Sequence, residues 1–274
     1  MDARQKNNRA LDAMDRSQYD FGLHIHAQGI VSYHVPIHLL RSPGYIWILQ
    51  LEKEWNKNMM NFDNDCIIVA NGEFPSTELP LSLLRSAKRI IACDGASGSL
   101  ISIGLIPDAI VGDLDSIPSE VKREFADRIV HVENQDINDL TKSVMFAHSL
   151  GEKRLLILGA TGLREDHTLG NISLLMDYAE MFYSVNMLSD HGLFTPLLDS
   201  ATLDSYPGEQ VSIFSMHPES EISTEGLKWQ ITKRRLTALW QGTLNEALGN
   251  QFSITLSAGG RVLIYRENPA KIGG

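Results

Sequence analysis

Short apolar runs, each followed by an acidic or glycine-containing cluster, recur between residues 66 and 167. Four clusters follow apolar runs in this way: ACDGAS (92–97), VGDLDSI (111–117), NQDINDLTK (134–142) and LGATGLREDH (158–167). Such runs are typical of buried strands, and most of the clusters open into a segment with helical spacing. The alternation predicts βαβ units and a parallel sheet. Because neighbouring parallel strands end at one edge of a sheet, the four clusters should meet in one crevice.

The periodicity and local composition of the sequence divide the chain into three parts. Residues 1–62 show no sustained helical or strand period, and this N-terminal extension is assigned no function. Residues 63–192 carry the strand and helix alternation, which predicts a three-layer α/β domain. Residues 193–274 consist of short β-prone pieces separated by Gly, Pro and Ser, which predicts a small antiparallel β-sandwich.

Composition excludes several classes of protein. The formal net charge is −10 and no dense Lys/Arg run carries interleaved aromatics, so we expect no nucleic-acid partner. No uninterrupted run reaches the roughly 20 apolar residues of a membrane span, and no secretory signal opens the chain, so we expect no membrane partner. Cys66 and Cys93 lie in apolar runs, which predicts buried thiols and a reducing, cytoplasmic location.

Carboxylates are concentrated in the clusters. The set is Asp94, Asp113, Asp115, Asp136, Asp139 and Asp166. Asp113 and Asp115 are two residues apart, so in extended backbone they would share one face, and Gly112 allows a tight turn beside them. Like charges this close repel unless a cation lies among them, and Mg²⁺ prefers oxygen ligands and phosphate. For any one aspartate, a role in a turn or helix cap is the alternative.

Groups suited to phosphate accompany the carboxylates. LGATG follows a predicted strand and precedes a helix expected from about Asp166 to Met181, so its backbone N–H groups could stabilise an anion. Arg164 and Lys142 can bind phosphate, although surface salt bridges are the alternative. Neither a GxxxxGK[ST] motif nor the HRD and DFG motifs of protein kinases is present. The residues alone therefore indicate a magnesium-dependent phosphoryl or pyrophosphoryl transferase, or a hydrolase.

Taken in order, these clusters resemble the motifs of the thiamine pyrophosphokinase family. The family pattern runs DGA, GDxDS, DQDxTDxTK, GGRxDHxxxNI and TxGLKW. In this chain it stands as DGA (94–96), GDLDS (112–116), NQDINDLTK (134–142), TGLREDHTLGNI (161–172) and TEGLKW (224–229), and LGNQF (248–252) is similar to a late SNxF element. Leu163 replaces the second glycine of GGR and Asn138 replaces a threonine, but neither change removes a charged group.

The resemblance implies transfer of pyrophosphate from ATP to the hydroxyl of thiamine, giving thiamine diphosphate and AMP, in a homodimer with active sites at the subunit interface. It implies that residues 63–192 form the nucleotide- and metal-binding catalytic domain and that residues 193–274 form the domain for thiamine binding and dimerisation. It implies metal binding by Asp113, Asp115 and Asp139, with Lys142 and Arg164 as further catalytic residues. The implied ATP-binding residues are Asp94, Gly95, Lys142, Gly159, Thr161, Gly162, Arg164, Asp166 and His167. The implied thiamine-binding residues are Gln135, Trp229 and Asn250.

Two other functions would use the same acidic edge. One is a magnesium-dependent nucleotide hydrolase, and the other is a catalytically silent module that binds nucleotide or thiamine. An exposed Trp229 would suit a cationic heterocycle and argues against the hydrolase, unless Trp229 is an ordinary core residue of the sandwich. The complete set of carboxylates argues against the silent module.

Overall fold

The computed structural model describes residues 23–25, 31–33, 55, 62 and 65–269. The chain forms two compact units, Met1–Glu54 and Trp55–Gly274. In the first unit β1 (Leu23–Ile25) pairs with β2 (Val31–Tyr33) in antiparallel register. Most of the N-terminal extension lies outside the described residues, so the structure does not test whether this extension has a function.

The parallel strands predicted from the apolar runs are present in the second unit. They are β3 (Cys66–Val69), β4 (Arg89–Cys93), β5 (Ala109–Gly112), β6 (Ile129–His131), β7 (Arg154–Leu158) and β8 (Ser184–Leu188). Their order across the sheet is β8-β7-β3-β4-β5-β6. The chain starts in the middle at β3, moves outward to β6 and returns to β7. The direction therefore reverses between β3 and β7, where ligand crevices of open α/β sheets lie.

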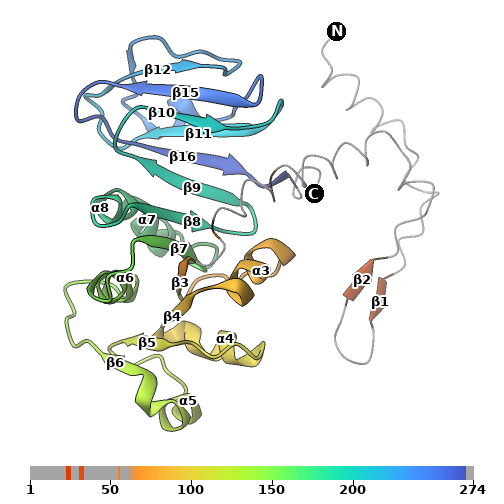
Figure 1. Cartoon of the computed structure of the whole chain (residues 1–274), viewed down its shortest axis with the longest axis vertical. Coiled ribbons are helices and arrows are strands. Elements are labelled where there is room, and N and C mark those ends of the chain that lie inside the picture. The colour runs from red at the N-terminus through yellow and green to blue at the C-terminus, as the bar shows by residue number, and fades with distance from the viewer. Residues whose placement is uncertain (1–22, 26–30, 34–54, 56–61, 63–64, 270–274) are drawn as a thin grey trace. The chain divides into compact units, whose positions relative to one another are not determined.

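Helices cover both faces of these strands, which confirms the predicted layered α/β fold (Figure 1). They are α3 (Glu78–Ser86), α4 (Ser97–Ser102), α5 (Ser119–Glu124), α6 (Asp139–Ser149), α7 (Glu165–Ser173) and α8 (Leu175–Ala179), with the 3₁₀ turns η3 (Asp94–Ala96) and η4 (Ala126–Arg128). Leu140, Val144 and Ala147 of α6 pack in one buried apolar cluster with Ile68 and Ile91. The helix predicted from Asp166 to Met181 is instead two helices, with Leu174 between them.

The antiparallel half adds strands to the same sheet and builds a second one. Strands β9 (Gly192–Leu197), β11 (Gln210–Ser215), β14 (Asn245–Glu246) and β16 (Val262–Glu267) extend the sheet beyond β8 in the order β14-β11-β16-β9-β8. The second sheet contains β10 (Ala201–Asp204), β12 (Glu221–Glu225), β13 (Arg234–Arg235) and β15 (Gln251–Leu256), and η5 (Leu239–Gly242) precedes β14. A buried apolar cluster between the two sheets confirms the predicted sandwich.

One sheet therefore runs through both halves of the second unit. Strand β9 pairs antiparallel with β8 through Met187 with Phe194 and Leu188 with Leu193. The predicted domain boundary between residues 192 and 193 falls inside β9, and the division into domains stays a prediction.

The two cysteines are free and buried, as predicted. Burial raises the pKa of both thiols to about 12, which keeps them protonated and unreactive. Within the described part of the chain, no helix has both the length and the apolar character needed to cross a bilayer. The cytoplasmic location stays a prediction.

Candidate active site

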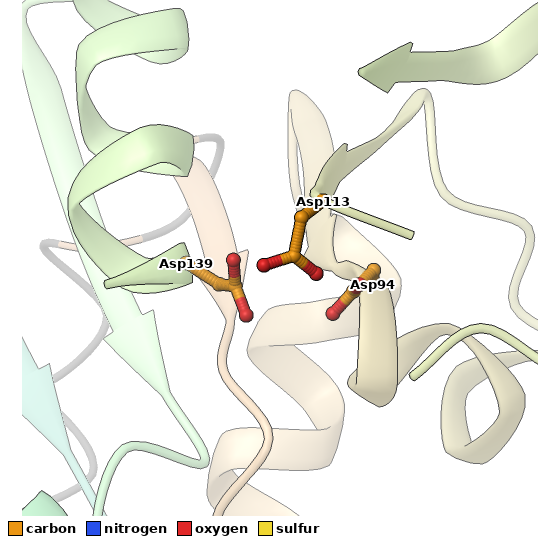
Figure 2. A group of neighbouring side chains, drawn as sticks. All are labelled: Asp94, Asp113 and Asp139. Carbon is orange, nitrogen blue, oxygen red and sulfur yellow. The ribbon is translucent and has the colours of Figure 1, made fainter. Parts of the chain in front are cut away.

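Three aspartates from separate segments meet at the edge where the parallel strands end. Asp94 directly follows β4, Asp113 directly follows β5, and Asp139 opens α6 after β6. Because β4, β5 and β6 are neighbours in the sheet, their carboxyl ends bring the three side chains together. Figure 2 shows the three carboxylates converging, and one oxygen of each lies within 4.8 Å of the others.

Asp94 is the buried member, with 1% of its surface exposed. Its carboxylate accepts hydrogen bonds from the backbone amides of Gly95 at 2.6 Å and Leu114 at 3.0 Å. A Cβ atom at Gly112 would lie 2.6 Å from the Asp94 carboxyl carbon, so only glycine fits there. Burial, and then repulsion from Asp139, raises the pKa of Asp94.

Lys142 is the cation of this group. Its buried ammonium donates to Asp139 Oδ1 at 2.9 Å and lies 3.3 Å from Asp113 Oδ2. Burial opposes its charge, but the hydrogen bonds to Asp139 and Asp113 outweigh burial and raise the pKa of Lys142. Hydrogen bonds from the Asp115 amide and from Lys142 lower the pKa of Asp113. Asp94, Asp113, Asp139 and Lys142 are called the acidic cluster below; it holds three carboxylates and one ammonium.

Asp115 is exposed and lies outside the group formed by the three aspartates. Its backbone amide donates to Asp113 Oδ1 at 3.3 Å. Leu114, between them, has φ 70°, so the GDLDS segment turns rather than staying extended. Gln135 does reach the group, since its Nε2 donates to Asp113 Oδ2 at 3.2 Å.

The glycine turn after β7 is joined to the loop after β3. Gly159 has φ 64° and its carbonyl accepts from the Gly72 amide at 2.6 Å, while the Thr161 carbonyl accepts from Glu73 at 2.7 Å. A Cβ atom at Gly72 would lie 2.5 Å from the Gly159 carbonyl oxygen. Gly162, with φ 97°, completes the turn. No site residue was predicted within residues 71–75, although a glycine just after a buried strand was the available signal.

An asparagine relay links this turn to the acidic cluster. Asn171 Nδ2 donates to the Ala160 carbonyl at 2.8 Å, and Asn138 Nδ2 donates to Asn171 Oδ1 at 3.0 Å. Asn138 is the N-cap of α6 and its Oδ1 accepts from the Thr141 amide at 2.9 Å. The relay therefore fixes the helix start that carries Asp139 against the glycine turn. No role was predicted for either asparagine from the sequence.

Arg164 and Asp166 lie exposed at the start of α7 and pair with each other, with Arg164 Nε 3.0 Å from Asp166 Oδ1. The hydrogen bonds from Arg164 and from the His167 amide lower the pKa of Asp166 to about 2. His167 is also exposed. Arg164 lines an open pocket of about 300 Å³. The other lining residues are Gly162, Leu163, Glu165, Thr168, Leu169 and Ile172.

Trp229 lies in the loop between β12 and β13 and is 51% exposed, so it is not a core residue of the sandwich. Asn245 holds its backbone, accepting from the Trp229 amide at 3.0 Å and donating to its carbonyl at 2.7 Å. The Lys228 ammonium lies 4.9 Å from the Trp229 ring centroid. Asn250 is exposed, and its carbonyl accepts from the Ser205 amide at 2.8 Å.

Comparison with known protein families accounts for both halves. Residues 81–187 match the family model described as thiamin pyrophosphokinase, catalytic domain, and residues 192–265 match the model described as thiamin pyrophosphokinase, substrate-binding domain. The chain belongs to the thiamine pyrophosphokinase family. The catalytic-domain model spans the acidic cluster and the glycine turn, and the substrate-binding model spans Trp229 and Asn250.

Individual relatives carry the same family name. Thiamine pyrophosphokinase 1 of Oryza sativa subsp. japonica is 33% identical over 141 residues, which are 46% of this chain and 53% of the rice protein. Thiamin pyrophosphokinase 1 of Caenorhabditis elegans is 29% identical over 165 residues, 55% of this chain and 67% of the worm protein. The chain thus spans about half the length of the rice relative that it matches.

Solved thiamine pyrophosphokinase structures share the fold. The enzyme from Candida albicans superposes with a TM-score of 0.66 at 18% identity, covering 77% of this chain and 92% of that one. The protein from Bacillus subtilis gives 0.62 at 20% identity, covering 74% and 99%. At this identity the likeness supports the two-part α/β and β-sandwich architecture.

Proposed function

We propose that the protein transfers a pyrophosphoryl group from ATP to the hydroxyl of thiamine, giving thiamine diphosphate and AMP. The observation that carries the proposal is the acidic cluster, which lies in the half that matches the family's catalytic domain. The other half matches the substrate-binding domain and presents an exposed tryptophan. Together they support a proposed site for a charged phosphate donor and one for an aromatic acceptor.

We propose Mg²⁺ as the metal ion. The acidic cluster offers only carboxylate oxygens, and a hard divalent cation prefers such ligands. One ammonium against three carboxylates leaves negative charge that a divalent ion would balance. Asp94, Asp113 and Asp139 would hold it, with Asp115 kept as a further proposed ligand. When bound, the ion would neutralise charge on the phosphate oxygens.

In the proposed reaction the thiamine hydroxyl oxygen forms a bond to the β-phosphorus of ATP. The bond from that phosphorus to the oxygen bridging to the α-phosphorus breaks, and AMP leaves. Lys142 fixes two carboxylates of the cluster, while Arg164, exposed beside the glycine turn, can turn from Asp166 to a phosphate. Asp113 or Asp139 can accept the hydroxyl proton. Correct positioning of the two substrates supplies much of the rate.

For the acceptor, Trp229 offers an indole face to the cationic ring of thiamine. Lys228 already lies over the ring, so the substrate would take the opposite face. Gln135, hydrogen-bonded to Asp113, is proposed to contact thiamine near the reacting phosphate, and Asn250 from the side of the sandwich. ATP is proposed to lie along the glycine turn, between Asp94 and Arg164.

We further propose a homodimer that shares its active sites. Figure 1 shows β12, which leads to the Trp229 loop, at one end of the second unit and β5, which leads to Asp113, at the other. Large apolar side chains are exposed in both halves. They include Leu163 and Leu169 beside the pocket at α7, and Trp229, Trp240, Leu244 and Leu248 in the sandwich. A second copy would cover these side chains and bring Trp229 to the acidic cluster.

Mixing two impaired variants tests the shared site. Asp113→Asn and Trp229→Ala subunits are unfolded together, refolded and assayed at a thiamine concentration too low for appreciable turnover by the Trp229→Ala protein. In a mixed dimer one site receives Asp113 from one subunit and Trp229 from the other, so activity should reappear. No recovery, with mixed dimers shown by mass spectrometry, would mean that each chain builds its own site.

The reaction itself is tested by the nucleotide product formed from Mg-ATP with and without thiamine. Thiamine-dependent AMP, with thiamine diphosphate in equal amount, is the expected result. ADP would mean a single phosphoryl transfer, and product formed without thiamine would indicate the hydrolase. Binding of both ligands without turnover would indicate a silent module.

A further inference from the structure

Trp55, near the end of the N-terminal extension, is built into the sandwich. Its side chain is 1% exposed and is among the largest fully buried side chains of the described chain. It belongs to the same compact unit as the remaining fold. The Arg266 guanidinium of β16 lies 5.7 Å from the centroid of its ring, which is a cation–π contact.

Arg266 is in turn paired with a buried carboxylate. Its Nε and Nη2 both lie 2.7 Å from Glu209 Oε1, and Nη2 also donates to the Asp204 carbonyl at 2.9 Å. Glu209 is fully buried and Arg266 nearly so. We call Glu209 and Arg266 the buried pair. An indole over the guanidinium keeps water away from this pair, and exclusion of water strengthens its hydrogen bonds.

The backbone around the buried pair holds the loop that carries Asn250. The Glu209 carbonyl accepts from the Ala247 amide at 2.9 Å, and the Gly208 amide donates to the Ala247 carbonyl at 2.8 Å. Ser205, next to Asp204, binds the loop twice: its amide donates to the Asn250 carbonyl at 2.8 Å and its hydroxyl to the Gly249 carbonyl at 2.8 Å. Residues 204–209 are therefore clamped to the buried pair on one side and to residues 247–250 on the other.

We propose that Trp55 is a positioning residue for the acceptor end of the active site, acting through Arg266 on the Asn250 loop. The proposal gives the end of the N-terminal extension a role, and it rests on the proposed thiamine-binding function of that loop. Trp55 seals the buried pair, the pair fixes residues 204–209, and these fix the loop. Loss of the indole face would loosen the Asn250 loop, where thiamine is proposed to bind. It would leave the acidic cluster and the glycine turn, where ATP is proposed to bind, unchanged.

The test compares Trp55→Ala with Trp55→Phe. The alanine variant should raise the KM for thiamine about tenfold while the KM for ATP stays within about twofold. Phenylalanine keeps an aromatic face, although it is smaller than the indole, and it lacks Nε1, which has no hydrogen-bond partner within the described structure. The KM for thiamine and the KM for ATP of Trp55→Phe should therefore stay close to those of the unmodified protein.

Leu236→Ala is the matched control, because Leu236 is a buried apolar residue of the sandwich core and has no polar group that could bond to the buried pair. It should lower the melting temperature without a selective rise in the KM for thiamine. An equal change of both KM values in Trp55→Ala, or the same thiamine effect in Leu236→Ala, would overturn the proposal.

Hydrogen exchange gives a readout that does not need the reaction. In Trp55→Ala the amides of Ala247 and Ser205 should lose protection relative to Trp55→Phe, while amides of β4 and β5 should not change. Unchanged protection at Ala247 and Ser205 would overturn the positioning role. Absence of thiamine-dependent AMP in the unmodified protein would instead overturn the proposed function, so the two failures are distinguishable.

Discussion

The acidic cluster and the buried pair use the same kinds of charged group in opposite ways. The cluster sets three carboxylates against Lys142, and two of them are partly exposed. In the buried pair one carboxylate faces one guanidinium, with Glu209 fully buried and Arg266 nearly so. An excess of like charge at an open edge is stable only with a cation supplied from outside, whereas a balanced pair needs none. The first arrangement suits a ligand site and the second suits a structural role.

Trp229 and Trp55, each beside a cation, repeat this contrast. The ring of Trp229 lies 4.9 Å from Lys228 and is half exposed, while the ring of Trp55 lies 5.7 Å from Arg266 and is sealed. The contact chemistry is the same, but only Trp229 has a face left for a ligand. Exposure, more than residue type, separates the two roles.

Neutralising Asp113 should have the largest effect of the changes considered, because it removes the charge excess that distinguishes the acidic cluster from the buried pair. Asp113→Asn removes a proposed metal ligand, so thiamine diphosphate formation should fall about a thousandfold. The fold should survive, because the change also relieves repulsion among the three carboxylates. Turnover and thermal melting measure the two effects, and Mg²⁺ should raise the melting temperature of the unmodified protein but not of the variant.

Two matched variants sharpen this prediction. Asp127→Asn changes an exposed aspartate of η4 and should leave turnover unchanged. Asp115→Asn tests the proposed fourth ligand: a loss as large as that of Asp113→Asn would place Asp115 in the metal site. Near-normal turnover of Asp113→Asn itself would contradict the metal assignment.

The buried pair should reveal itself in the pH dependence of stability. Burial raises the pKa of Glu209 from its ordinary 4.5 to about 7, although Arg266 acts in the other direction. A carboxyl group whose pKa is higher in the folded than in the unfolded protein stabilises the fold, because the folded protein holds the proton more tightly. This stabilisation is complete at pH values below the pKa of the unfolded state, and it is lost as the pH rises through the pKa of the folded state. The free energy of unfolding should therefore fall by about 3 kcal/mol between acid pH and pH 8.

Glu209→Gln is the reference for this measurement, because it removes the titration and keeps an oxygen that can accept from Arg266. Urea unfolding of both proteins at several pH values gives the difference, in which all other titrating groups cancel. A constant difference between pH 5 and pH 8 would show that Glu209 does not titrate in this range.

Trp229→Ala should have an intermediate effect, confined to the acceptor. The KM for thiamine should rise by about 10- to 100-fold through loss of stacking and cation–π attraction, with the KM for ATP little changed. The melting temperature should barely move, because the side chain is half exposed. Equal weakening of thiamine and ATP would argue against an acceptor platform.

The smallest expected effect lies in the asparagine relay. Asn138→Thr keeps an oxygen that can cap α6 but loses the bond to Asn171, so the free energy of unfolding should fall by about 1 kcal/mol. Asn138→Ala loses the cap as well and should fall further in thermal melting. Equal losses in the two variants would mean that the bond to Asn171 contributes nothing.

Local patterns in the sequence predicted the strands and the edge that they form. RIIAC and RLLIL read as buried parallel strands because both of their faces are covered, and they are β4 and β7. That logic also placed Asp94, Asp113 and Asp139 at one edge. The sequence did not predict that Asp113 joins the group of three aspartates while Asp115 lies outside it, since the two side chains share a face only in extended backbone. The positive φ of Leu114 breaks that alternation.

Features that depend on distant residues could not be predicted. Asn171 bonds to residues 11 and 33 positions away, and no local pattern marks such a partner. The continuation of the sheet from β8 into β9 did have a signal, because only three residues separate the two strands and short connections favour antiparallel pairing. The change near residue 193 from alternating strands and helices to short β-prone pieces led instead to a predicted domain boundary.

The shared sheet has a consequence for motion. A hinge between the two halves would have to break the backbone pairing of β8 with β9, at roughly 1 kcal/mol for each hydrogen bond, and shear the side chains packed around it. The halves should therefore move as one stiff body, and a substrate cannot be enclosed by swinging one over the other. Enclosure has to come from loops or from a neighbouring subunit, and in the proposed homodimer assembly itself would act as the closing step.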